Sequence, residues 1–203
     1  MFRKTLLVLS ALPLLFGVAF SATEELQPEK DAGIFEGAPV GQYGSMDFCW
    51  IGYDSGRSDT LIHFPLDDYI GVELYSATLE VYVFYSWGTI PSDNWMARVA
   101  DDWVETIVCW QYSPGWDDGI VLDFGPPTLD DWLSIDVTTI VESWLDESFD
   151  NYGFYMSTYD ETGGVWFRSR EYSTSTLRPK LTFEYDFTPI QPVSVGKIKT
   201  LFK

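Results

Sequence analysis

Four pairs of adjacent aspartates are the side chains in this sequence with the most readily named chemistry. Two carboxylic acids placed across a bound sugar can hydrolyse a glycosidic bond, and loop carboxylates are also the ligands that calcium prefers. All four pairs lie in segments typical of turns, where solvated aspartate is common, and the chain has no Asp-x-Asp-x-Asp-Gly loop. The pairs are compatible with a structural calcium ion but do not identify its ligands. They only weakly indicate a hydrolase. They are Asp67-Asp68, Asp101-Asp102, Asp117-Asp118 and Asp130-Asp131.

Most other catalytic classes lack the residues that they need. The single histidine, His63, lies in the strand-like run Thr60–Pro65, where an imidazole is usually packed. The sequence has no HExxH motif and no glycine-rich phosphate loop, and two cysteines are too few for a structural zinc site. We therefore expect no catalytic residues and no cofactor beyond the possible calcium ion.

Cys49 and Cys109 both lie in apolar, strand-like runs. If the two runs face one another in an exported protein, a disulfide would close a loop of about 60 residues and stabilise the fold by roughly 4 kcal/mol. Two buried free thiols are the equal alternative, because free cysteine behaves as a small hydrophobic residue.

The nine tryptophans divide by their neighbours in the chain. Trp87, Trp95 and Trp116 adjoin Gly, Pro, Ser or Asp in expected loops, so we expect them to present exposed aromatic faces, of the kind on which sugars stack. Large aromatic residues are more often buried, and we expect the other six to pack in the core. These are Trp50, Trp103, Trp110, Trp132, Trp144 and Trp166.

The charge is strongly one-sided. The whole chain has 12 Lys and Arg against 31 Asp and Glu, a formal net charge of −19. Residues 23–187 hold 7 of the basic residues and all the acidic ones, a net −24. A surface of this sign repels polyphosphates and anionic lipids, which excludes nucleic acid as a partner and disfavours acidic polysaccharides.

Both ends of the sequence differ from its body. Residues 1–22 combine Arg3 and Lys4, an apolar stretch too short to span a bilayer, and small residues before a cleavage point, which is typical of a signal peptide. Residues 188–203 hold two prolines, three lysines and no acid, and we interpret them as a linker and basic tail, either frayed or used for sorting or attachment. The mature protein is expected to be secreted or held at the cell surface, without a membrane span.

Short β-branched and aromatic runs separated by turn residues predict an all-β fold. In the run Thr78–Tyr85, Leu79, Val81 and Val83 alternate with polar or aromatic residues, as in a sheet packed on one face. Only the stretch after Asp136 has helical spacing, with Ile140, Val141 and Trp144 on one face. We predict a single antiparallel β-sandwich of the jelly-roll type over residues 23–187, with one short helix. The expected strands are Asp31–Phe35, Asp47–Tyr53, Thr60–Leu66, Tyr75–Tyr85, Trp95–Ala100, Thr106–Gln111, Trp132–Asp136, Tyr152–Thr158, Val165–Arg170 and Pro179–Asp186.

The order of several short motifs resembles that of the DNRLRE-domain family, and together they cover nearly all of residues 31–185. They are Asp31-Ala32, Gln42–Ser45, Ser76–Val83, Trp103–Trp110, Ile135–Thr138 followed by Trp144, Phe167–Glu171 and Arg178–Leu181. The resemblance implies an exported β-sandwich associated with carbohydrate binding and surface proteins. Within its motifs, we expect Arg170 and Glu171 to pair across the sheet edge and brace the final strand, and Arg178 with Pro179 to turn the chain into that strand.

The sequence leaves three functions open. The first is a non-catalytic module that binds a glycan or another component of the cell envelope, with Trp87, Trp95 and Trp116 as its platforms. The second is a structural or adhesive surface protein in which the sandwich is a spacer, and the third, less favoured, is a glycoside hydrolase or lyase. The first function depends on aromatic faces, the second on an attachment segment and the third on converging acids.

Overall fold

The computed structural model describes residues 20–187, which form eleven strands and one α-helix. Three short 3-10 helices occupy the connections Asp67–Tyr69, Trp110–Tyr112 and Ser175–Leu177. The strands are β1 (Phe20–Leu26), β2 (Lys30–Phe35), β3 (Phe48–Tyr53), β4 (Arg57–His63), β5 (Glu73–Trp87), β6 (Asn94–Val99), β7 (Trp116–Phe124), β8 (Asp131–Asp136), β9 (Phe154–Thr158), β10 (Gly163–Arg168) and β11 (Lys180–Phe187), and the helix is α1 (Thr138–Leu145).

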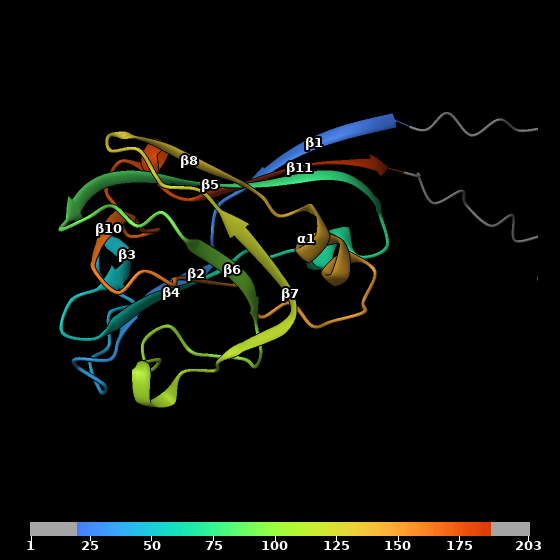
Figure 1. The fold of residues 1–203 in the computed structure, drawn as a ribbon. Helices are drawn as coiled ribbons and strands as arrows, with labels where there is room; N and C mark the ends of the chain where they lie inside the picture. Colours follow the sequence, from blue (N-terminus) through green and yellow to red (C-terminus); the bar gives the residue numbers. More distant parts are fainter. Residues whose placement is uncertain (1–19, 188–203) are drawn as a thin grey trace, which may run out of the picture.

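The strands form one antiparallel sheet that curls into two layers. Its order is β1-β11-β5-β10-β3-β4-β9-β6-β7, with β2 added to β4 and β8 added to β5. Figure 1 shows β1, β11, β5 and β8 above β2, β4, β6 and β7, while β10 and β3 connect the layers at one side. The predicted antiparallel β-sandwich is confirmed, and the finer jelly-roll connectivity stays a prediction.

The main core lies between the two layers. The inward residues of β5, Leu79, Val81 and Val83, are completely buried, as their alternation predicts. Met96 of β6 and Phe154 of β9 meet them from the other layer. The helix α1 closes one end of this core with its buried face, as Figure 1 shows.

A second core covers the outer face of the lower layer. Leu61, Trp95 and Tyr155 point away from the main core, because their strand neighbours point into it. They pack under the segment between β6 and β7, residues 100–115, which contributes Trp103 and Val108. The predicted strand Thr106–Gln111 is wrong for this reason: its apolar residues belong to a covering loop that forms no ladder.

Two observed strands were not predicted, and both lie at edges of the sheet. β7 contains Asp117, Asp118 and Gly119, which resemble a turn in sequence and form a bulge against β6, where Arg98 pairs with Asp117 and Ala97 with Val121. β1 pairs along its whole length with β11, from Phe20↔Phe187 to Leu26↔Leu181. The expected domain boundary after residue 22 therefore falls inside a paired strand. The expected signal peptide up to residue 19 and the tail 188–203 lie outside the described residues.

The predicted helix is confirmed as α1. The Asp136 carboxylate accepts hydrogen bonds from the Thr138 amide (3.0 Å) and the Thr138 hydroxyl (2.7 Å) at the start of the helix. Ile140, Val141 and Trp144 are buried on its inner face. Within residues 20–187, this eight-residue segment is the longest α-helix, and none is long and apolar enough to cross a bilayer.

Replacing Leu79 with alanine should destabilise the fold strongly. The side chain is 0% exposed in the main core, so its loss removes apolar burial and leaves a cavity, and we expect the free energy of unfolding to fall by about 2–5 kcal/mol. Urea titration followed by tryptophan fluorescence measures the change. Ser76→Ala, at an exposed position of the same strand, is the matched control, and equal midpoints for the two variants would contradict this assignment of the core.

Candidate functional site

A strongly apolar hollow on the described surface is a cleft where β3, β10 and the end of β5 meet. We call it the aromatic cleft, and its volume is about 420 Å³. Trp50 comes from β3, Trp166 from β10, and Tyr85 and Trp87 from β5. The remaining lining residues are Phe35, Tyr43, Met46, Phe48, Asp54 and Ser58. Small-molecule sites typically have volumes of roughly 300–1,000 Å³.

Strand alternation in β3 and β10, together with a bulge in β5 between Val83 and Tyr85, places these rings on the outside of the sheet. Cys49 and Ile51 of β3 are buried in the core, so Phe48 and Trp50 between and beside them project outward. Trp166 lies opposite Trp50 in the β10–β3 ladder. Its ring stacks on Phe48, with the centroids 4.3 Å apart and the planes at 12°. The result is a rigid wall of partly exposed rings.

Glycines allow the indoles to lie flat against the backbone. A Cβ atom added to Gly33 of β2 would lie 2.7 Å from the Trp50 ring. One added to Gly52 would lie 2.8 Å from the Trp87 ring, and one added to Gly164 would overlap that ring. The ring positions therefore depend on three positions without a side chain.

Polar groups in the cleft are few. Asp54 is exposed, Ser58 is buried, and none of the described lining residues is a lysine or arginine. The Trp87 Nε1 donor is buried without a hydrogen-bond partner in the described part of the chain. The cleft thus offers aromatic faces and the carboxylate acceptor of Asp54.

The three tryptophans predicted as platforms separate into two places. Trp87 lines the aromatic cleft, whereas Trp95 and Trp116 line a second hollow, with ring centroids 5.3 Å apart. Trp116 is 43% exposed, but Trp95 is only 4% exposed and belongs to the second core. The expectation of an exposed Trp95 is therefore wrong, because β6 is buried on both faces.

Trp50 and Trp166 were predicted in the core, but both line the aromatic cleft. Of that group, Trp103 and Trp144 are buried, whereas Trp110 and Trp132 are partly exposed like Trp50 and Trp166. The signal was present in the β3 run Phe48–Tyr53, where Cys49 and Ile51 alternate with aromatic rings. A strict period of two would have assigned Trp50 to the outer face.

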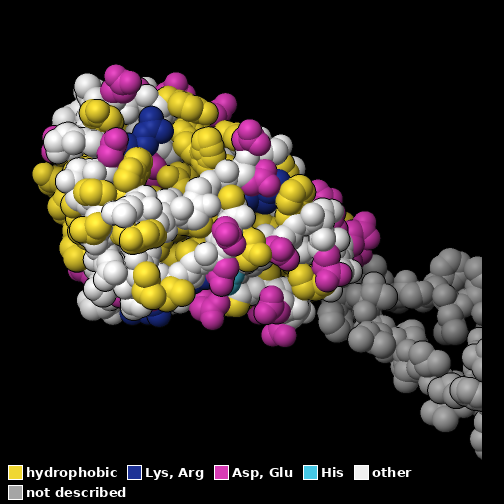
Figure 2. Space-filling view, turned by 90° about the horizontal axis from the view of Figure 1, so that it is seen from below, with side chains coloured by type: hydrophobic (Ala, Val, Ile, Leu, Met, Phe, Trp, Pro, Cys, Tyr) yellow, Lys and Arg dark blue, Asp and Glu magenta, His cyan; other side chains and the backbone are white. Residues whose placement is uncertain are grey.

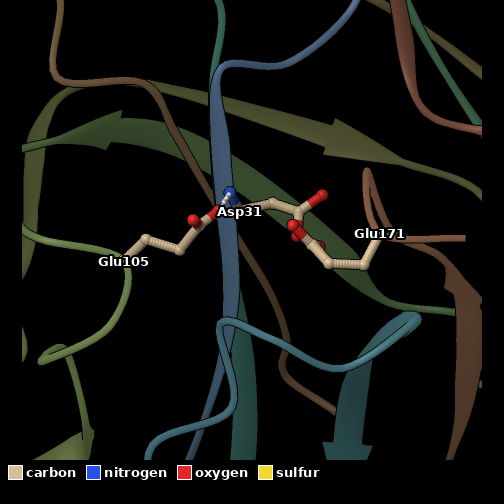
Figure 3. Close-up of side chains that lie close together, drawn as sticks. All are labelled: Asp31, Glu105 and Glu171. Carbon is tan, nitrogen blue, oxygen red and sulfur yellow. Dashed lines mark hydrogen bonds between the residues drawn. The ribbon is translucent and has the colours of Figure 1, made fainter.

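Three carboxylates meet beside β2, and they are the described group best placed to hold a metal ion. One oxygen from each of Asp31, Glu105 and Glu171 lies within 4.8 Å of the other two. Figure 3 shows the Asp31 carboxyl turned toward Glu171, while Glu105 approaches the Asp31 backbone from the opposite side. The Asp31 amide donates a hydrogen bond to Glu105 at 2.9 Å.

Arg170 already occupies much of this carboxylate cluster. Its Nη1 lies 3.2 Å from Glu105 and 2.9 Å from Glu171, and its backbone amide donates to Asp31 at 2.7 Å. The predicted pairing of Arg170 with Glu171 is present, but the second partner is the loop residue Glu105 and not the final strand. The cluster ties the turn after β10 to β2 and to residues 100–115.

One guanidinium does not balance three carboxylates. Burial raises the pKa of Asp31 well above its usual value of 3.8, and the neighbouring Glu171 and Glu105 charges raise it further. Burial also raises the pKa of Glu105, although Arg170 opposes that shift. A protonated Asp31 is the simplest way for the cluster to reduce its charge.

The remaining predicted residues lie away from both hollows. Cys49 and Cys109 are both buried and free, so the free-thiol alternative describes this structure, and the Cys49 thiol is 3.7 Å from Asp31. Arg178 Nε donates to the Tyr172 carbonyl at 2.7 Å, just before β11. Pro179 follows and is buried at the entry to that strand.

Comparison with protein families gives one match. The model of carbohydrate-binding module family 96 matches residues 22–185, which is most of the chain and all of the sandwich except its outermost positions. A search of curated proteins found no significant match.

Substitution of Gly164 by alanine should move the Trp87 ring. The added Cβ would overlap the indole and lie 2.6 Å from the Ile51 carbonyl oxygen, so we expect a loss of about 1–3 kcal/mol in the free energy of unfolding and an altered tryptophan emission spectrum. Gly125→Ala is the control, because nothing lies within 4 Å of its added Cβ. Identical melting curves for the two variants would show that the cleft does not depend on Gly164.

The variant Asp31→Asn should gain stability relative to the wild type as the pH rises. The folded protein holds the Asp31 proton to a higher pH than the unfolded chain does, so this group lowers the wild-type free energy of unfolding as the pH increases from near 3.8 through the raised folded pKa. Asparagine cannot ionise and removes that loss. Thermal melts between pH 4 and pH 8 measure the difference, with Asp118→Asn, an exposed position, as control. A difference that stays constant with pH would contradict the assignment.

Proposed function

The chain belongs to carbohydrate-binding module family 96, and we propose that its glycan binds in the aromatic cleft. The function is that of a non-catalytic carbohydrate-binding module. The observation that supports the location is the wall formed by Trp50, Trp166, Tyr85 and Trp87 around a hollow of about 420 Å³. The apolar faces of sugar rings stack on such rings, and a few polar groups then orient the hydroxyls.

The cleft chemistry favours a neutral glycan. Asp54 is the one charged residue among the described lining residues, and the body of the protein carries a net −24, which agrees with the excess of acidic over basic side chains on the face in Figure 2. A uronate or sulfate group would meet repulsion without a nearby cation in the cleft. Sugar hydroxyls, in contrast, can donate to the exposed Asp54 carboxylate.

The proposed ligand contacts differ from the predicted set of Trp87, Trp95 and Trp116. Trp87 remains a ligand contact in the cleft, and Trp50 and Trp166 join it. Trp116 and Trp95 lie in the other hollow. Arg170, Glu171 and Arg178 are assigned structural roles, since their hydrogen bonds join backbone segments within the sandwich.

The proposed biological setting follows from the sequence. Residues 1–22 serve as an export signal, residues 188–203 act as a linker and basic tail, and the sandwich between them binds a glycan outside the cell or in the cell envelope. The motif order is that of a DNRLRE domain, and the chain as a whole has no catalytic activity.

Affinity electrophoresis tests the location of the site. We expect gels containing a soluble neutral polysaccharide, from a panel of barley β-glucan, arabinoxylan, galactomannan and pullulan, to retard the wild-type protein. Tyr85→Ala and Trp166→Ala should each weaken that retardation about tenfold, equivalent to about 1.4 kcal/mol. Tyr75→Ala removes a similarly exposed tyrosine of β5 outside the cleft and should behave as the wild type. Unchanged mobility of the wild-type protein on every gel would count against the proposed function.

A further inference from the structure

We propose that this module has a second carbohydrate-binding site, in the hollow formed by Trp116, Trp95 and Tyr155 over the buried carboxylate of Asp59, and that it takes a neutral sugar ring. We call it the Asp59 pocket. The inference rests on the proposed function in so far as both sites bind glycan. The volume of the Asp59 pocket, about 420 Å³, equals that of the aromatic cleft.

The wall of the Asp59 pocket is a stacked aromatic group. Trp95 and Tyr155 lie parallel, with ring centroids 5.7 Å apart and planes at 11°. Trp116 meets Trp95 edge-on at 73°, and 43% of its surface is exposed. Tyr159, which is 52% exposed, packs against Trp95 beside them. An exposed indole held in one orientation by buried rings is a preformed stacking surface.

The floor of the pocket is polar and held in place. Asp59 is 1% exposed and accepts hydrogen bonds from the Tyr155 hydroxyl and the Ser157 hydroxyl, both at 2.5 Å. Those two bonds fix the carboxylate and leave it further acceptor capacity. Trp95 is more than nine-tenths buried and lines this pocket, and its Nε1–H has no hydrogen-bond partner among the described residues.

Two further side chains give the pocket both donors and acceptors. Arg57 and Glu36 lie on its rim, and the Glu36 carboxylate is anchored by the Arg57 backbone amide at 2.9 Å. The guanidinium makes no ion pair in the described part of the chain. Together with Asp59, these groups carry one positive and two negative charges when ionised. Hydroxyl groups satisfy such a mixture, whereas an anionic ligand would face the two carboxylates.

The two sites are separate because they lie on opposite faces of β4. Ser58 lines the aromatic cleft, and its neighbours Arg57 and Asp59 line the Asp59 pocket. Successive residues of a strand point to opposite faces, and the two hollows share no lining residue. One glycan chain therefore fills one site without blocking the other, and the module is able to join two chains.

The experiment uses the same four polysaccharides and three variants. Trp116→Ala removes the exposed platform of the Asp59 pocket, Arg57→Gln removes its guanidinium while sparing the aromatic packing, and Tyr85→Ala combined with Trp166→Ala removes the cleft. Tyr112→Ala, which is 66% exposed and lines neither site, is the control. Circular dichroism and thermal melts report whether each variant is folded. Affinity electrophoresis measures binding, and the viscosity of the polysaccharide solution measures cross-linking of chains.

We expect the cleft variant to remain measurably retarded, and Trp116→Ala or Arg57→Gln in that background to abolish the remaining retardation. The wild type should raise the viscosity, and every variant that lacks one site should lose that effect while still binding. If the cleft variant alone abolishes binding and Trp116→Ala and Arg57→Gln bind and cross-link as the wild type does, the second site is wrong and the proposed function stands. Absence of wild-type binding to all four polysaccharides would contradict both proposals.

Discussion

The alternation of side chains along the strands is the constraint on which core and binding surface both depend. In β3, Cys49 and Ile51 point into the main core while Trp50 points into the aromatic cleft. In β4, Ser58 and Asp59 supply different hollows. A shift of one residue in either ladder would exchange these roles completely. The strand pairing that buries the core therefore also determines which aromatic rings are exposed.

The carboxylate cluster has a different role in that arrangement. Asp31, Glu105 and Arg170 come from β2, from the loop over the second core and from the turn after β10, and their hydrogen bonds join these three segments. The cluster is costly to ionise because one cation faces three acids in a partly buried place. Burial of Asp31, followed by the neighbouring Glu171 and Glu105 charges, raises the pKa of this carboxyl group. Arg170 lies within hydrogen-bond distance of both Glu105 and Glu171.

Much of the sandwich could be predicted from the sequence, because its central strands have strong period-two patterns. Leu79, Val81 and Val83 identify one buried face without further information. The edge strand β7 could not be identified in this way, since its acidic bulge has the composition of a turn. Local sequence also could not distinguish Trp95 from Trp116. The two rings touch, but Trp95 also packs into the second core under residues 100–115, whereas Trp116 on the edge strand β7 is 43% exposed.

The aromatic cleft was missed for a related reason. Large aromatic residues are buried on average, and that average assigned Trp50 and Trp166 to the core. The positions of the indoles in the cleft also depend on glycines in other segments, Gly33 for Trp50 and Gly164 for Trp87, which receive the flat faces of the rings. Such pairings between distant positions are absent from any short window of sequence.

The pairing of β1 with β11, from Thr23↔Glu184 to Leu26↔Leu181, determines how the sandwich bears mechanical load. Asp186 of β11 pairs with Glu73 at the start of the 15-residue β5, whereas Trp87 is at the other end of that strand, on the order of 50 Å away. A force pulling residues 23 and 187 apart would break the β1–β11 hydrogen bonds one after another. A force between residue 187 and a ligand held beside Trp87 would instead run along the strands and load many hydrogen bonds of β11 and β5 at once.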